Sequence, residues 1–184
     1  MKAVHRSVGA VIVDECNRVL LQKRDSIDSI WFPGFWGVFG GGCDVGEDSE
    51  RALYREIMEE LKVQLQDYEF FLKWRFNCPS LGGGERERTF YIVKFSRDMV
   101  NSIELSEGAD YKFFSIRDMP SPLDVVPFDL AALTLWANNK FIDRSLSPFL
   151  LSSVNAADDH QKGHPLFLSR PEALPPASEL LSLE

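Results

Sequence analysis

Two runs of sequence, separated by seven residues, decide the fold: Gly41-Gly42-Cys43-Asp44-Val45-Gly46-Glu47 and Arg55-Glu56-Ile57-Met58-Glu59-Glu60-Leu61-Lys62-Val63. A helix is predicted from Asp48 or Ser49 to about Leu61, because either residue can cap the free amides of the first turn. Each residue advances about 100° around a helix axis, so Glu56, Glu59 and Glu60 share one face. The residues expected to pack on a sheet from the other side are Leu53, Tyr54, Ile57, Met58 and Leu61.

The three glutamates on one face predict a cation site. Clustered carboxylates repel one another, and a hard divalent cation removes that repulsion. Mg²⁺ prefers oxygen ligands and commonly uses carboxylates together with substrate phosphates. Two such ions can clamp the attacking and leaving oxygens of a displacement at phosphorus. Arg55 is always charged, so it is suited to orient a neighbouring carboxylate or to hold a phosphate.

A run of three glycines, Gly40-Gly41-Gly42, precedes the helix. Glycine lets backbone amides approach an anion closely, and a helix N-terminus favours negative charge. Alone, a triple glycine is weak evidence for a phosphate site. A second such run, Gly82 to Gly84, is explained equally well as a flexible turn between two strands.

Together these residues resemble the Nudix box of MutT-like hydrolases. The box is a glycine, five residues, a glutamate, seven residues, and then Arg-Glu-apolar-x-Glu-Glu-x-Gly-apolar. The matching residues are Gly41, Glu47, Arg55, Glu56, Ile57, Glu59, Glu60 and Val63. Lys62 stands where the family has a glycine suited to a left-handed conformation, which would cost a lysine about 1 kcal/mol or more. We therefore expect a slightly altered helix exit.

The resemblance, which extends over roughly Val4 to Asn138, implies a fold and a cofactor. The fold is α/β (α+β), a mixed sheet sandwiched between helices with a loop–helix–loop catalytic motif. The cofactor is Mg²⁺, with Mn²⁺ as a substitute. Glu56, Glu59 and Glu60 would be the metal ligands, Glu47 would assist them, and Arg55 would orient Glu56.

Relatives in the family often add a carboxylate from a later loop, as a metal ligand or as the general base for the attacking water. Glu107 is the best candidate here, with Glu104 and Asp110 in reserve. No fixed spacing ties Glu107 to the helix. A solvated loop charge therefore remains an equal alternative for this residue.

Substrate contacts are predicted at four positions. Gly41 and Gly42 would face phosphate, and Arg24 ends the second predicted strand, where similar proteins often place a phosphate contact. Trp36, or Trp31, could stack on a nucleobase, since every base offers a π-face. Arg86 and Arg88 are further cations, although exposed surface charge is the simpler interpretation for them, as it is for Arg24.

Around the box, the chain predicts alternating strands and helices. Strands are expected at 6–14, 19–24, 68–76, 88–95 and 110–116, and a second helix at 127–137 with Pro127 at its first position. The Nudix-type domain is predicted to span residues 1–142. Residues 143–184 contain five of the ten prolines and are interpreted as an extension, either irregular or docked on the domain or on the second subunit of a homodimer.

Composition excludes several other classes of protein. The 184 residues have a net charge of −8, which disfavours binding to a nucleic-acid polymer. No apolar run approaches the length that spans a membrane. Three cysteines, Cys16, Cys43 and Cys78, argue against a disulfide framework and predict the reducing cytoplasm.

The sequence thus predicts a Mg²⁺-dependent pyrophosphohydrolase whose partner is a small, nucleotide-type diphosphate substrate. Oxidised nucleoside triphosphates, nucleotide sugars and dinucleoside polyphosphates remain open as substrates. One alternative is a non-catalytic Nudix-like sensor, against which the intact Glu56, Glu59 and Glu60 argue. Isopentenyl diphosphate isomerase is a relative, but we find no sign of its extra catalytic cysteine and glutamate. A last alternative is that the glutamate-rich helix is only a salt-bridged surface helix. It would leave the spacing of Gly41 and Glu47 unexplained.

Overall fold

The computed structural model describes residues 4–77, 79 and 83–138. Six strands form one sheet: β1 (His5–Asp14), β2 (Val19–Lys23), β3 (Trp36–Gly37), β4 (Asp67–Asn77), β5 (Glu85–Phe95) and β6 (Asp110–Phe114). The helical segments are α1 (Ser49–Leu61), the short α2 (Arg97–Asn101), a 3-10 helix (Pro122–Asp124) and a helix over residues 127–138. The strands and helices predicted from the sequence correspond to β1, β2, β4, β5, β6, α1 and the helix over residues 127–138.

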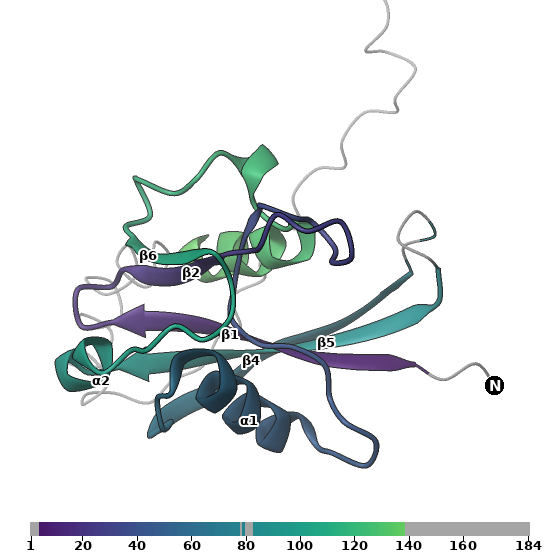
Figure 1. Ribbon diagram of the computed structural model, residues 1–184, viewed down its shortest axis with the longest axis horizontal. Coiled ribbons are helices and arrows are strands. Elements are labelled where there is room, and N and C mark those ends of the chain that lie inside the picture. The colour runs from purple at the N-terminus through teal and green to yellow at the C-terminus, as the bar shows by residue number, and fades with distance from the viewer. Residues whose placement is uncertain (1–3, 78, 80–82, 139–184) are drawn as a thin grey trace, which may run out of the picture. The chain divides into compact units, whose positions relative to one another are not determined.

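The sheet is mixed, as expected (Figure 1). Its order is β3-β2-β1-β5-β4, and β6 pairs with β2. β1 and β5 run parallel over ten residue pairs, from His5 beside Arg86 to Asp14 beside Phe95, whereas the other strand pairs are antiparallel. The parallel pair places the starts of β1 and β5 side by side, next to the glycine run.

Each face of the sheet is covered by a helix (Figure 1). Side chains alternate along β1, so Val8, Ala10 and Ile12 belong to one apolar cluster and Val11 and Val13 to the other. The first cluster includes the buried face of α1, and the second includes the helix over residues 127–138. The predicted sandwich of a mixed sheet between helices is therefore confirmed.

Helix α1 begins as predicted but buries a narrower face. Asp48 is its N-cap, and a side-chain oxygen accepts a hydrogen bond of 2.9 Å from the Arg51 amide. Leu53, Ile57 and Leu61 follow one another at intervals of four residues, and all three are fully buried. The expected burial of Tyr54 and Met58 is wrong, because these side chains are 39% and 42% exposed. They follow the buried residues by one position, which turns them about 100° outward.

The end of α1 follows the family pattern more closely than expected. Lys62 keeps the left-handed conformation of the family's glycine, with φ 58° and ψ 22°. Its amide donates to the Met58 carbonyl at 3.2 Å, and its Nζ donates to the Glu59 carbonyl at 3.1 Å. The expected altered exit is not found, so the lysine carries the strain that a glycine would avoid.

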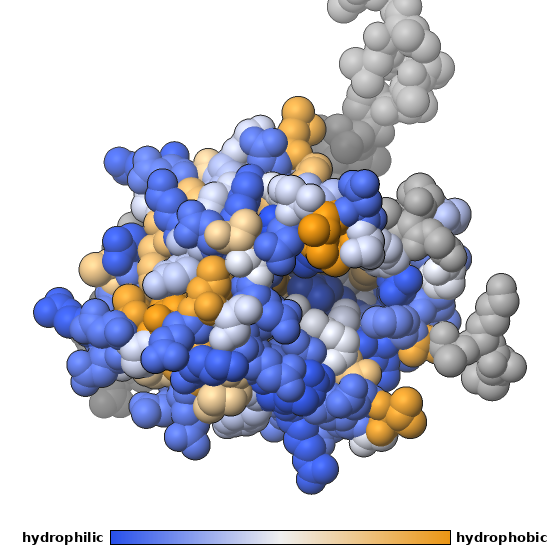
Figure 2. All heavy atoms as spheres, in the orientation of Figure 1, coloured by the Kyte–Doolittle hydropathy of each residue, from blue (hydrophilic) through white to orange (hydrophobic). Residues whose placement is uncertain are grey.

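The predicted extension, residues 143–184, lies outside the described residues, so its role and the domain boundary stay predictions. Within the described part of the chain, no helix is long and apolar enough to cross a membrane. On the face seen in Figure 2, the surface over α1 is mainly hydrophilic.

Candidate active site

The glycine run lies against the start of β1 and is shaped by close contacts. The amide of Val8 donates to the Gly41 carbonyl at 2.8 Å, and the Cys43 amide donates to the Arg6 carbonyl at 3.0 Å. A Cβ atom on Gly41 would lie 2.6 Å from a carboxylate oxygen of Glu56. The Glu56 carboxylate therefore packs directly against the backbone at position 41, and a side chain there would displace it.

Arg55 is the centre of the box. Its guanidinium donates to both Glu47 oxygens at 3.1 and 2.9 Å, to Glu56 at 2.9 Å and to Glu59 at 3.1 Å. It also donates to the Gly42 carbonyl at 2.7 Å. These bonds raise the pKa of Arg55 and hold the pKa of Glu47 below its usual range. Arg55 therefore joins the loop to the helix and fixes the orientation of Glu56.

Glu60 is the most deeply buried carboxylate of the box, with an exposed fraction of 5%. One oxygen accepts a 2.7 Å hydrogen bond from the Gly40 amide, and the other accepts a 3.3 Å bond from Gln22 Nε2. Burial, together with the nearby negative charges of Glu56 and Glu107, raises the pKa of Glu60 to about 7. The anion that the glycine run approaches is thus Glu60, a carboxylate of the protein itself.

The negative charge of Glu107 lies close enough to these carboxylates to affect their pKa values. The pKa of Glu56 is raised by burial and also by the charges of Glu59 and Glu107. Glu107 follows Ser106, whose amide donates to the Glu60 carbonyl at 2.8 Å. Glu59 lies further out, with its side chain 53% exposed. The chain therefore brings Glu56, Glu60 and Glu107 together, with Glu59 on their rim.

This set of residues fits a hard divalent cation. The donors are carboxylate oxygens, and their mutual repulsion is the condition that a cation relieves. Within residues 4–77, 79 and 83–138, no three acidic, His or Cys side chains have the geometry of a formed metal site. Instead, the Nη1 atom of Arg55 contacts both Glu56 and Glu59. Arg55 thus supplies the positive charge between two of the predicted ligands.

A cavity of about 430 Å³ adjoins the glycine run, and Gly40, Gly41 and Gly42 line it. The start of β1, the segment before β3, the end of β4, the start of β5 and the start of the helix over residues 127–138 also line it. Its aromatic side chains are Trp31, Phe32, Phe76 and Phe128, and its cations are Arg24, Arg86 and Arg88. The cavity therefore offers flat apolar surfaces and positive charge beside the carboxylates.

Trp31 and Arg86 form one wall of this cavity. The Arg86 guanidinium lies over the Trp31 ring at 3.9 Å from its centroid. The Trp31 carbonyl accepts a 2.9 Å hydrogen bond from Arg24 Nε. Of the four predicted substrate contacts, Gly41, Gly42 and Arg24 thus line the cavity.

Trp36, the fourth predicted contact, lies elsewhere. Its ring packs edge-on against Phe114 at 5.0 Å, and Lys23 Nζ lies over it at 5.1 Å. Trp36 is not among the residues that line the cavity. Because β3 pairs with β2 at this position, the ring is turned toward the core. The geometry therefore corrects the expectation, and Trp31 is the tryptophan available for stacking.

Asp129 is a site residue that the sequence did not indicate. It is 2% exposed, lines the cavity and accepts a hydrogen bond from the Val38 amide at 3.1 Å. Arg88 forms an ion pair with it at 3.2 Å. Burial raises the pKa of Asp129, whereas Arg88 opposes this rise. The feature of the sequence that could have pointed to Asp129 is a carboxylate among apolar residues in the first turn of a predicted helix.

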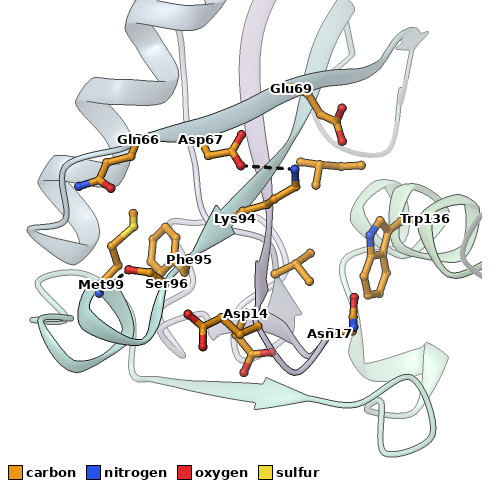
Figure 3. Close-up of a pocket in the computed structure, with 13 residues that line it drawn as sticks. Asp14, Asn17, Gln66, Asp67, Glu69, Lys94, Phe95, Ser96, Met99 and Trp136 are labelled. Carbon is orange, nitrogen blue, oxygen red and sulfur yellow. Dashed lines mark hydrogen bonds and ion pairs between the residues drawn. The ribbon is translucent and has the colours of Figure 1, made fainter.

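A second cavity, of about 340 Å³, lies at the far ends of β1 and β5 (Figure 3). Figure 3 shows the ion pair between Asp67 and Lys94, joined at 3.3 Å, and Trp136 on the other side of the space. None of the predicted site residues lines it. The cavity beside the glycine run is therefore the one connected to the carboxylates.

The family model described as the NUDIX domain matches residues 3–136. With the box geometry and the mixed sheet, this match shows the family: the chain belongs to the NUDIX domain family. The predicted resemblance to MutT-like Nudix hydrolases, which act on phosphoanhydride bonds, is confirmed at this level.

Individual relatives support the same assignment. Nucleoside triphosphatase NudI of Escherichia coli K12 is 31% identical over 107 residues, which are 56% of this chain and 73% of the relative. Isopentenyl-diphosphate delta-isomerase idi1 of Aspergillus fumigatus is 28% identical over 142 residues. That alignment covers 63% of this chain, and the chain spans only 50% of the isomerase.

Solved structures share the fold. A MutT NUDIX hydrolase from Burkholderia pseudomallei has a TM-score of 0.61 and 26% identity, over 72% of this chain and 98% of that one. The NUDIX domain of Shewanella oneidensis NrtR, complexed with ADP ribose, has a TM-score of 0.60 and 24% identity, over 77% and 90% of the two chains. At 24% identity, the similarity to the NrtR domain shows a shared fold alone.

Proposed function

We propose that the protein is a Mg²⁺-dependent pyrophosphohydrolase of a nucleoside diphosphate or triphosphate derivative. The observation that carries this proposal is the shared wall between the carboxylates and the cavity. Gly41 contacts the Glu56 carboxylate on one side and lines the cavity on the other. A diphosphate that bridges the two would have its phosphorus atoms beside the carboxylates and its organic group among the aromatic rings.

Glu56, Glu59 and Glu60 would hold Mg²⁺, and Mn²⁺ would be an alternative ion. When bound, the cation supplies positive charge that polarises the phosphoryl oxygens and the attacking water. Arg55, held by Glu47, keeps Glu56 in position. Glu107 is exposed on its loop, so it is the carboxylate best able to accept a proton from the water.

Cavity residues would bind the rest of the substrate. Arg24 and Arg86 offer donors to phosphate oxygens, and the Trp31 and Phe32 rings offer faces to a base. Asp129 is buried and lines the cavity, so its carboxyl group is suited to form hydrogen bonds with a polar group of the substrate. The partner proposed for this site is one small diphosphate, with no nucleic-acid polymer and no membrane. A homodimer in the cytoplasm stays a prediction.

The test is phosphate or pyrophosphate release with Mg²⁺ across nucleoside triphosphates, nucleotide sugars and dinucleoside polyphosphates. Turnover of one class by the wild type, and its loss in Glu60→Gln, is the expected result. A Glu60→Gln variant with near-normal rate would overturn the metal assignment. Tight binding of one compound without turnover would favour a nucleotide sensor instead, and double-bond migration in isopentenyl diphosphate would favour an isomerase.

A further inference from the structure

The loop that carries Glu107 is fixed at both of its ends. The amides of Glu104 and Ser106 donate to the carbonyls of Leu61 and Glu60, at 3.0 and 2.8 Å. These carbonyls belong to the last turn of α1 and have no acceptor role within the helix. On the other side, the Ala109 amide donates to the Lys23 carbonyl of β2 at 2.8 Å. The loop thus joins the end of α1 to the end of β2.

Gln22 lies in the middle of this arrangement. It belongs to β2 and is 6% exposed. Its Nε2 atom donates to the Glu60 carboxylate at 3.3 Å and to the Glu107 carbonyl at 3.0 Å. One amide nitrogen with two hydrogens therefore links the helix carboxylate to the backbone of the loop residue.

Gly108 makes room for this link. It has a φ of 90°, and a Cβ atom there would lie 2.8 Å from Gln22 Cγ and 2.9 Å from Nε2. Any other residue would meet both backbone strain and a collision with the amide. The loop therefore has the one residue type that lets Gln22 reach the Glu107 carbonyl.

An amide suits this position chemically. A glutamate at position 22 would add another negative charge to the group formed by Glu56, Glu60 and Glu107. A lysine would add a cation that competes with a bound metal ion. The glutamine donates hydrogen bonds without changing the charge of the site.

We propose that Gln22 is a positioning residue that fixes the Glu107 loop relative to Glu60 by hydrogen bonds from one amide to both. This inference rests on the proposed function, because it assumes that Glu60 and Glu107 act together. Gln22 does not touch the substrate, and its effect is transmitted through the two glutamates. Second-sphere partners of metal ligands change metal affinity or activity by about 10- to 100-fold when they are removed.

Gln22→Met tests this role, because methionine keeps the length of the side chain and removes both donors. We expect kcat to fall about 10-fold while KM for the nucleotide stays nearly constant. Mn²⁺ affinity, measured by electron paramagnetic resonance without substrate, should fall by a similar factor. Gln66→Met is the matched control, since Gln66 is exposed and lines the second cavity. It should leave kcat, KM and Mn²⁺ affinity unchanged.

A double-mutant cycle separates positioning from a general structural effect. If Gln22 acts through Glu107, Gln22→Met should add little to the loss caused by Glu107→Gln. Gly108→Ala should reproduce the kinetic loss of Gln22→Met, and it serves as the second variant if Gln22→Met does not fold. Multiplied losses in the double variant, or wild-type kcat and Mn²⁺ affinity in both single variants, would overturn the inference.

Failure of the proposed function gives a different result. In that case the wild type would hydrolyse no compound of the panel. The Mn²⁺ affinities of the wild type, Gln22→Met and Gly108→Ala would still show whether Gln22 positions the carboxylates. Equal affinities in all three would reject the role of Gln22 on that evidence alone.

Discussion

Glu60 shows how burial adjusts the chemistry of a single residue. Its carboxyl group is buried between the Gly40 amide and Gln22, and burial raises its pKa from 4.5 to about 7. A carboxyl whose pKa is higher in the folded than in the unfolded state stabilises the fold below the unfolded value. That contribution is lost as pH rises through the folded value. The metal-free protein is therefore destabilised by this group between about pH 4.5 and about pH 7.

Urea unfolding in the presence of a chelator checks this effect. We expect Glu60→Gln to gain stability relative to the wild type as pH rises from about 5 to about 8, because the amide cannot ionise. Each pKa unit corresponds to about 1.4 kcal/mol, so the gain should be on the order of 3 kcal/mol. Glu59→Gln, at an exposed position, should show no comparable change with pH. A constant difference between wild type and Glu60→Gln at both pH values would contradict the raised pKa.

At the scale of elements, α1 ends under strain. Lys62 has a φ of 58°, a conformation that costs non-glycine residues about 1 kcal/mol or more. Lys62→Gly should raise the free energy of unfolding by about 1 kcal/mol or somewhat less, since glycine also gains freedom in the unfolded chain. The urea midpoint measures the change. Lys62→Ala keeps the strain and loses only the bond from Nζ, so it should not stabilise, and equal effects of both variants would reject the explanation.

Local pattern was sufficient to predict α1 but not all of its environment. Helical spacing and a cap at Asp48 are properties of neighbouring residues, so the bounds of the helix were predicted closely. The burial of Tyr54 and Met58 was predicted wrongly because a helical repeat does not define how wide the covered face is. The parallel pairing of β1 with β5 joins segments 81 residues apart, at His5 and Arg86, and nothing in either segment specifies the other.

The same distinction explains what could be predicted of the site. Glu47, Arg55 and Glu56 occur within one motif, and their contacts follow from its spacing. Trp31, Arg86 and Asp129 come from three separate parts of the chain, and only the folded sheet brings them around one cavity. Trp36 and Trp31 are both tryptophans and lie close in sequence, so the sequence does not distinguish them as stacking residues. Pairing of β3 with β2 is what distinguishes them.

At the scale of the whole molecule, the proposed function assigns catalysis and substrate recognition to opposite sides of the glycine run. Arg86→Gln should therefore raise KM about 10-fold and change kcat little, because it removes a cation and its contact with Trp31 from the cavity. Steady-state kinetics on the substrate class found above gives the two constants separately. Arg117→Gln, at an exposed position outside the cavity, is the control. A fall in kcat with unchanged KM would place Arg86 among the groups that act in the transition state.

The contacts of Arg55 also affect how the protein should respond to removal of its metal ion. Its guanidinium already bridges Glu56 and Glu59, so removal of a divalent ion does not leave those two carboxylates facing each other without a counter-charge. Removal of the ion by a chelator should therefore yield a folded, inactive protein and not an aggregate. Activity should return when the ion is added back. The protein would therefore be suitable for replacing one metal ion with another.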